Sequence, residues 1–326
     1  MGAENTGRFT NENKRTRNET VSDRPFSLPP GQFKPKQSLG QNFLSDQNYV
    51  LKIVDTLEDE SVDGVRVVEL GPGPGALSRV LLERYPKMTA VEIDQRAVEF
   101  LGDKLPGLNV INMDVLQCDW SQMAKERGGR LSIIGNLPFY ITSQILFSLA
   151  DSWNAVDKAV VTMQYEVAER MVAKTSTKQY GILSVVFQLY GTPKLNFKIP
   201  PTVFFPRPKV DSALVTMEFR PHPALQSVNS DKLRKVITAS FRQRRKMLRA
   251  SLKDLLNTHS LTLPEKWRTL RPEALTPLDF VALTKDIFGA ENAGAAQLPH
   301  RCTQHSFLLF FASCRLNLLP LFIALQ

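Results

Sequence analysis

Cysteine is scarce in this sequence, and the few cysteines lie far apart. Cys118, Cys302 and Cys314 are too few and too scattered to form a disulfide framework. No Cys-x-x-Cys pair and no cysteine–histidine spacing indicates zinc, so we expect no metal site. A protein of a reducing compartment is the simplest interpretation.

Acidic residues are fewer than basic ones. The 326-residue chain has 32 Asp and Glu and 41 Lys and Arg, which gives a net charge of +9. Hydrophobic residues make up 43% and charged residues 22%, which excludes a mostly disordered or fibrous protein. The length fits one large domain or two modest ones. The basic excess suits nucleic acid, an anionic membrane surface or an acidic protein, and composition does not choose among them.

Residues 1–33 lack apolar periodicity and the apolar core of a signal peptide. Their four acidic residues fit poorly with an organellar presequence, so a targeting extension and a disordered basic arm both stay open. We favour an organellar location, in a plastid or a mitochondrion, over a bacterial-type cytoplasm.

Residues 290–326 form an apolar tail to which we assign no role. Its segment 306–325 approaches the ~20 residues of a membrane span. Arg315, Asn317 and Pro320 interrupt the segment, and a central arginine costs about 2.5–3.5 kcal/mol on insertion. We therefore favour an additional packed segment or an artefact of the gene model over a membrane helix, and we expect no stable membrane partner.

Short apolar runs alternate with helical patterns between the two ends. The expected strands are 65–70, 88–94, 108–113, 131–135 and 159–163, and the first expected helices are 76–84 and 95–104. This alternation predicts an α/β fold with a parallel, doubly wound, Rossmann-like sheet. Periodicity becomes purely helical after Arg220–Pro223, so we predict a sheet domain over 34–224 and a small all-helical domain over 225–289.

A glycine-rich turn, Gly71–Gly75, stands where the first of these strands leads into a helix. Glycine lets the backbone approach a ligand closely, and a helix N-terminus offers unpaired N–H groups. Gly71, Gly73 and Ala76 match the dinucleotide pattern G-x-G-x-x-A. The turn alone is a weak signal, so an NAD(P) oxidoreductase stays an alternative.

Two carboxylates follow at the ends of the next strands. Glu92 lies about 20 residues after the glycines, where an acid accepts hydrogen bonds from ribose hydroxyls. Asp114 ends the following strand, where it could accept from an adenine amino group. Dinucleotides and S-adenosylmethionine both contain adenosine, so these acids do not separate the two cofactors.

The fourth strand leads into Asn136, Leu137, Pro138 and Phe139. The Asn136 amide oxygen and the carbonyl of Leu137 or Pro138 can accept both hydrogens of a planar amino group. Phe139 can stack on the base that carries this group. Such contacts favour a pyramidal nitrogen and stabilise the positive charge that develops on it during methylation.

Further motifs lie before and after this turn, and the whole series is typical of one protein family. The stretches are Gln37–Leu44, Glu69–Gly75, Glu92, Asp114, Asn136–Phe139, Gln164–Arg170, Tyr180–Val185, Phe205–Ser212, Phe241–Lys246 and Arg271–Glu273. Over about residues 33–288 the chain resembles the bacterial-type small-subunit rRNA adenine dimethyltransferases, which are class I S-adenosylmethionine-dependent enzymes. Phe139 stands where many members have Tyr, Tyr165 where Lys is usual, and Ile182 where Arg is common.

The resemblance implies an enzyme that dimethylates two adjacent adenosines near the 3′ end of small-subunit rRNA. It implies the immature small ribosomal subunit as partner and a role in subunit maturation. We also expect a monomer. The residues it implies for donor contact, with Gly73 added from the glycine turn, are Asn42, Leu44, Gly71, Gly73, Glu92, Asp114 and Asn136.

A basic window, Lys232–Lys253, holds nine basic residues and no acidic one. Apolar residues recur in it at helical spacing and should face a core; they are Leu233, Val236, Ile237, Phe241, Leu248 and Leu252. The basic residues should form one exposed stripe on the helix, suited to a phosphate backbone. The residues expected to bind RNA are Arg207, Lys209, Lys235, Arg242, Arg244, Arg245, Lys246, Arg249 and Lys253.

Two rivals stand beside the dimethyltransferase and the oxidoreductase. A non-catalytic RNA-binding factor for ribosome assembly or organellar transcription could retain the same fold. An antibiotic-resistance type of enzyme would methylate large-subunit rRNA. The Phe241–Lys246 motif favours the small-subunit type by resemblance.

Overall fold

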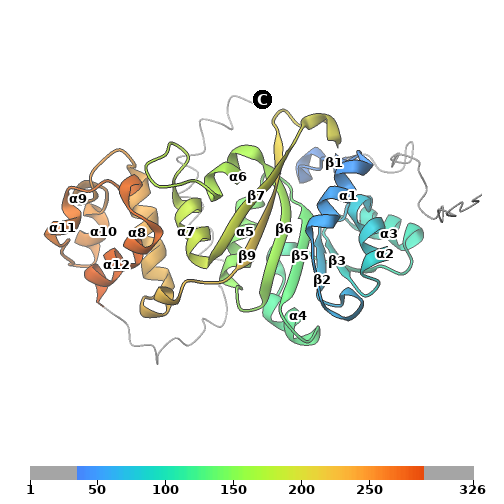
Figure 1. Ribbon diagram of the computed structural model, residues 1–326, viewed down its shortest axis with the longest axis horizontal. Coiled ribbons are helices and arrows are strands. Elements are labelled where there is room, and N and C mark those ends of the chain that lie inside the picture. The colour runs from blue at the N-terminus through green and yellow to red at the C-terminus, as the bar shows by residue number, and fades with distance from the viewer. Residues whose placement is uncertain (1–34, 290–326) are drawn as a thin grey trace, which may run out of the picture.

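The computed structural model describes residues 35–289, and its centre is a seven-stranded sheet of order β4-β3-β2-β5-β6-β9-β7 (Figure 1). The strands are β2 (Val67–Leu70), β3 (Thr89–Glu92), β4 (Asn109–Asn112), β5 (Leu131–Asn136), β6 (Val156–Gln164), β7 (Gly191–Ile199) and β9 (Ser212–Phe219). The α-helices are α1 (Gln47–Thr56), α2 (Ala76–Arg84), α3 (Gln95–Lys104), α4 (Trp120–Glu126), α5 (Thr142–Asp151), α6 (Tyr165–Met171), α7 (Ile182–Tyr190), α8 (Ser230–Arg242), α9 (Leu248–Ser251), α10 (Lys253–Thr258), α11 (Glu265–Arg268) and α12 (Pro277–Phe288).

The predicted strands are confirmed as the parallel part of this sheet. β4, β3, β2, β5 and β6 pair in parallel, each within a few residues of its predicted bounds. Helices α2 and α3 have the predicted bounds. Parallel neighbours align their carboxyl ends, so the residues that follow β2, β3, β4 and β5 meet at one edge of the sheet.

The other side of the sheet is antiparallel, which the sequence patterns did not predict. β9 runs antiparallel to both β6 and β7. Pro193 lies within β7, and a proline inside an apolar run argues against a central strand because it cannot donate to the ladder. β7 tolerates the proline because it is the edge strand.

The inner strands β2, β3 and β5 are buried on both faces, as expected for parallel strands covered by helices. Val67 packs with residues of α1 and α2 on one face. Its neighbour Val68 packs with residues of α5 and α7 on the other face, because successive strand residues point in opposite directions.

A separate two-stranded sheet holds the segment before α1. β1 (Phe43–Leu44) pairs antiparallel with β8 (Phe204–Phe205), and the Ser45 N–H donates to the Val203 carbonyl at 2.8 Å. Phe43 and Leu44 are buried. The N-terminal motif is therefore fastened to a loop some 160 residues further along the chain.

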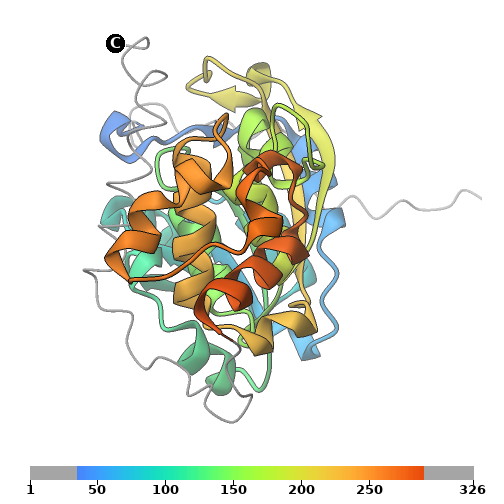
Figure 2. The ribbon, with the colours of Figure 1, turned by 90° about the vertical axis from the view of Figure 1, so that its left-hand side faces the viewer.

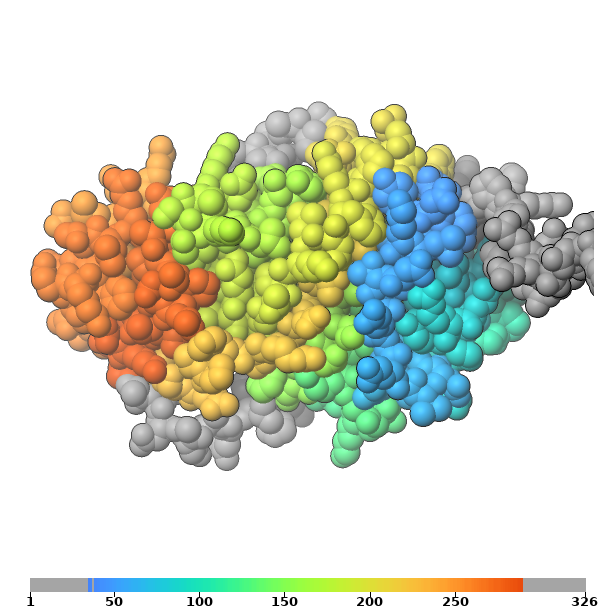
Figure 3. All heavy atoms as spheres, viewed as in Figure 1, coloured from blue at the N-terminus to red at the C-terminus, as the bar shows by residue number. Residues whose placement is uncertain are grey.

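The elements from α8 to α12 are all helical and lie at the end of the molecule opposite α1–α3 (Figures 1 and 3). Seen from that end, these helices lie in front of the sheet (Figure 2). α12 packs on α7 and α8, and the buried side chains of these helices continue the cluster that covers one sheet face. The division at residue 225 stays a prediction, since the hydrophobic core crosses it.

The single basic helix expected over Lys232–Lys253 is wrong. α8 ends at Arg242, a turn follows, and α9 begins at Leu248. Tertiary hydrogen bonds override helical propensity here, because the Leu248 N–H donates to the Leu270 carbonyl at 2.8 Å. All six residues expected to face the core are buried nevertheless.

No helix within residues 35–289 has the length and hydropathy needed to cross a bilayer. The predictions for residues 1–33 and 290–326 lie outside the residues that the structure describes, 35–289.

Replacing Phe280 tests the core of the C-terminal helices. Phe280 is fully buried on α12 and stacks on Phe241 with ring centroids 5.6 Å apart. Phe280→Ala should lower the free energy of unfolding by about 3–5 kcal/mol, measured by denaturant titration. Leu278→Ala on the same helix is the control, because Leu278 is exposed and its loss should cost about 0.5 kcal/mol or less. Equal losses in both variants would contradict this packing.

Candidate active site

A cavity of about 210 Å³ opens at the carboxyl edge of the parallel strands. Its walls come from the turns after β2, β3, β4 and β5 and from the segment before β1. Ligands of open α/β sheets bind at this edge, where strand order reverses between neighbouring strands.

The glycine turn forms one wall and depends on the N-terminal segment beneath it. Gly73 has φ +53°, and a Cβ there would lie 2.8 Å from the ring of Phe43. A larger residue would be strained and would displace Phe43. The Gly71 N–H donates to the Val91 carbonyl at 2.9 Å, which fixes the turn against β3.

Glu92 is a buried carboxylate that joins the glycine turn to the start of α3. Its Oε2 accepts from the Gly73 N–H and its Oε1 from the Asp94 N–H, both at 2.9 Å. Burial raises the pKa of Glu92, and these two N–H groups oppose that rise by stabilising the charge. Each oxygen keeps a second lone pair for a ligand hydroxyl.

Asp114 caps the short 3₁₀-helix η3 (Val115–Gln117), and its Oδ1 accepts from the Leu116 N–H at 2.9 Å. Ile93 and Met113 also line the cavity and are 52% and 40% exposed. The wall thus pairs two carboxylates with two apolar side chains, the combination that suits a planar base joined to a sugar.

The turn after β5 forms the opposite wall, and hydrogen bonds fix its orientation. Asn136 Nδ2 donates to the Asn42 carbonyl at 2.7 Å, while Asn136 Oδ1 accepts from the Thr162 hydroxyl. The Pro138 carbonyl accepts from the Thr142 hydroxyl at 2.9 Å. The amide oxygen of Asn136 is therefore held in one orientation with a lone pair to spare.

The model of the ribosomal RNA adenine dimethylase family matches residues 32–288. The chain belongs to this family. It is 46% identical over 274 residues to the ribosomal RNA small subunit methyltransferase A of Salinibacter ruber, covering 82% of this chain and 92% of that protein. The protein of the same name from Streptococcus pneumoniae is 41% identical over 273 residues, covering 79% and 93%.

Solved structures support the fold of this dimethylase. A dimethyladenosine transferase from Plasmodium falciparum superposes with a TM-score of 0.60 at 21% identity, over 74% of this chain and 95% of that one. The 23S rRNA methyltransferase ErmE gives 0.54 at 24% identity, over 76% and 99%. The Rossmann-like sheet with C-terminal helices is confirmed, and family membership decides against the oxidoreductase.

The dimethylase cavity brings together most of the residues predicted for it. Those that line it are Asn42, Gly71, Gly73, Glu92, Asp114, Asn136, Leu137, Pro138 and Phe139. Leu44 does not line it and is buried in β1. No group of His, Cys, Asp or Glu in residues 35–289 could hold a metal ion.

Several lining residues were not singled out from the sequence. Gln41, Ile93, Met113 and Tyr140 each adjoin a predicted residue, so their proximity in sequence was the available signal. Tyr140 is 47% exposed at the cavity mouth.

The predicted RNA-binding residues differ in their surroundings. Arg244 donates from Nε to Glu273 at 3.2 Å and from its other two nitrogens to the carbonyls of Thr177 and Lys178. These contacts make Arg244 a link between two loops. The others are exposed: Arg207, Lys209, Lys235, Arg242, Arg245, Lys246, Arg249 and Lys253.

Glu69 is a second buried acid near the dimethylase cavity, on β2 immediately before the glycine turn. Burial raises the pKa of Glu69 to about 8, and the charge of Glu92 adds to the rise. Glu69 is therefore mostly protonated at neutral pH, which spares the sheet a second buried charge beside Glu92.

This protonation predicts how stability depends on pH. The folded protein keeps a proton on Glu69 that the unfolded chain, with a pKa near 4.5, releases as pH rises toward 8, so stability is lost through that window. Glu69→Gln removes the effect, and its melting temperature relative to the parent should rise by about 4 °C or more between pH 5 and pH 8.5. Glu83→Gln is the control, because Glu83 is exposed on α2. A pH-independent difference for Glu69→Gln would contradict the protonated form.

Proposed function

We propose that this protein transfers methyl groups from S-adenosylmethionine to the 6-amino groups of two adjacent adenosines near the 3′ end of small-subunit rRNA. The observation that carries this proposal is the fixed Asn136 turn facing Glu92 and Asp114 across one cavity. The names of the two bacterial relatives favour the small subunit over the large-subunit rival.

The cavity residues fit S-adenosylmethionine. Glu92 would accept from the ribose hydroxyls, and Asp114 from the adenine amino group, with Ile93 and Met113 against the base. A Cβ at Gly71, which has φ +62°, would meet no atom within 4 Å, so open space lies beside the turn. The donor would supply an electrophilic methyl group on a sulfonium centre.

Asn136 would orient the amino group of the target adenine. Its Oδ1, already bonded to Thr162, would use its remaining lone pair for one amino hydrogen. The Pro138 carbonyl already accepts from the Thr142 hydroxyl and the Ile141 N–H, so we assign the second hydrogen to the Leu137 carbonyl. Both acceptors draw the nitrogen toward a pyramidal geometry in which its lone pair can attack.

Phe139 would stack on the target base, since it lines the cavity beside Asn136 and is partly buried. Its ring face would also stabilise the positive charge that develops on nitrogen. Phenylalanine in place of the more usual tyrosine retains both effects.

The non-catalytic rival has less support. A binding factor needs neither two carboxylates at the donor wall nor an amide held by hydrogen bonds on both of its atoms. Each of these features serves methyl transfer, and selection for RNA binding alone would leave them without use.

The phosphate backbone would lie on the exposed residues around the turn after α8. Arg245 and Lys246 are exposed there, whereas Arg244 is bound to Glu273. Arg207 and Lys209, on the loop that follows β8, would give a second contact. Such contacts position the RNA without reading its sequence.

The organellar location gains no support from the relatives, which are bacterial proteins. It rests on residues 1–33, outside the described residues, and stays a prediction, as does the monomer.

Asn136→Ala tests the chemistry. The variant should lower kcat for methyl transfer to under-methylated small subunits by about 100-fold or more, because one of two acceptors for the amino group is lost. Incorporation of labelled methyl groups measures this. Asn109→Ala is the matched control, since Asn109 begins β4 at the opposite edge of the sheet. Near-normal turnover by Asn136→Ala would sink the assignment.

A double variant, Arg245→Gln with Lys246→Gln, tests the RNA surface. It should weaken binding to small-subunit RNA uniformly and reduce the slope of log affinity against log salt by about 2, one for each lost phosphate contact. Filter binding over a salt series gives the slope. Lys87→Gln is the control, because Lys87 lies between α2 and β3, away from the turn after α8, and its ammonium pairs with Asp63. An unchanged slope in the double variant would show that this surface does not bind the phosphate backbone.

A further inference from the structure

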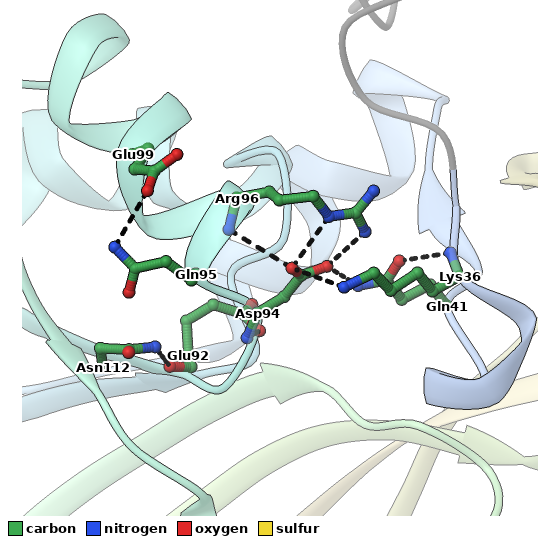
Figure 4. A network of polar contacts seen from close by, with 8 residues as sticks. All are labelled: Lys36, Gln41, Glu92, Asp94, Gln95, Arg96, Glu99 and Asn112. Atoms are coloured by element: carbon green, nitrogen blue, oxygen red, sulfur yellow. Dashed lines mark hydrogen bonds and ion pairs between the residues drawn. The ribbon is translucent and has the colours of Figure 1, made fainter.

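Asp94 is a buried carboxylate beside the cavity, and it has no role in the proposed reaction. Its side chain is 1% exposed, yet it does not line the cavity. It caps α3 and accepts hydrogen bonds from three side chains (Figure 4). The distances are 3.1 Å from Gln41 Nε2, 3.4 Å from Lys36 Nζ, and 3.0 and 2.6 Å from Arg96 Nε and Nη2.

Two of these donors belong to the segment that crosses the cavity before β1. Lys36 and Gln41 are also joined to each other, because the Lys36 N–H donates to Gln41 Oε1 at 2.8 Å. This bond closes residues 36–41 into a loop, and both of its ends reach the same carboxylate (Figure 4). Leu39, Gly40 and Gln41 from this loop line the cavity.

The far side of the segment is attached to the wall where the target base would bind. The Asn42 carbonyl accepts from Asn136 Nδ2 at 2.7 Å. Gly40 has φ +58°, and a Cβ there would lie 2.9 Å from the ring of Tyr140. The segment therefore spans the cavity, with polar contacts to Asp94 on one side and to Asn136 on the other.

Asp94 also contacts the donor wall through its backbone. Its N–H donates to Glu92 Oε1 at 2.9 Å, and Glu92 lines the cavity. One residue thus connects the carboxylate expected to bind ribose with the segment that leads to Asn42, which is expected to contact the donor. Hydrogen bonds from Arg96 and Gln41 lower the pKa of Asp94 to about 2, so the carboxylate stays charged at physiological pH.

We propose that Asp94 is a positioning residue that holds the segment 36–42 over the donor site, and that affinity for S-adenosylmethionine depends on it. This inference rests on the proposed function. Methyl transfer itself takes place at the Asn136 turn, so the rate at saturating donor should depend on Asp94 much less than donor binding does.

Asp94→Asn is the direct test, in the full-length protein. Asparagine caps a helix as well as aspartate, so α3 should remain. Its amide removes the charge and points N–H groups at the donors of Lys36 and Gln41. The Kd for S-adenosylmethionine, measured by equilibrium dialysis, should rise about tenfold, since a hydrogen bond to a charged group is worth that much. The kcat for methyl transfer should stay within about twofold of the parent.

A second readout needs no donor. Hydrogen exchange of the amides in 36–42 should accelerate in Asp94→Asn, while α3 and the sheet exchange as in the parent. Arg96→Gln is the matched control, because it removes the partner of Asp94 that lies outside the segment. It should change neither donor affinity nor exchange in 36–42.

The outcomes separate the two claims. Unchanged affinity and unchanged exchange in Asp94→Asn would overturn the role of Asp94, as would a lower kcat with unchanged donor affinity. A parent protein that neither binds the donor nor transfers methyl groups would overturn the proposed function instead. If Asp94→Asn fails to fold, Lys36→Met removes one contact from the segment side and should show both effects to a smaller degree, and its failure to do so would count against the proposal.

Discussion

The two hydrogen bonds that the Glu92 carboxylate accepts hold the active site together. They come from the N–H groups of Gly73 and Asp94, so one buried side chain fixes the glycine turn after β2 and the start of α3 after β3. Burial alone would favour the neutral acid, and the two donors stabilise the charge that Glu92 needs for its proposed role in binding ribose. The cavity depends on this arrangement because both of its donor-side walls meet at Glu92.

The N-terminal segment up to β1 contacts the same two elements that Glu92 joins. Phe43 packs beneath Gly73, and Gln41 reaches Asp94. Asn136 then ties it to the opposite wall through the Asn42 carbonyl. The proposed donor site and the proposed target-base site are thereby parts of one hydrogen-bonded unit, which suits a reaction that must align a methyl group with an amino nitrogen.

Sequence reasoning located the parallel half of the sheet and the strand-end residues Glu92, Asp114 and Asn136, because apolar periodicity and the glycine turn are local signals. It missed β7, where Pro193 obscures the edge strand, and it also missed β9. It also extended the basic helix past Arg242, because the end of this helix is set by contacts between residues that are far apart in sequence. The break depends on contacts with Leu270, Glu273 and the carbonyl of Lys178, which lie far away in sequence. The contacts of Asp94 with Lys36 and Gln41 could not be predicted either, because these residues lie more than 50 positions away in sequence.

Mapping the reaction product is the most direct test that this protein dimethylates adenosines of small-subunit rRNA. Small subunits that lack the modification would be incubated with the full-length protein and labelled S-adenosylmethionine, and every methylated adenosine located by mass spectrometry of rRNA fragments. We expect two methyl groups on each of two adjacent adenosines near the 3′ end of the small-subunit rRNA. Label confined to another site, to large-subunit rRNA or to no RNA at all would contradict it.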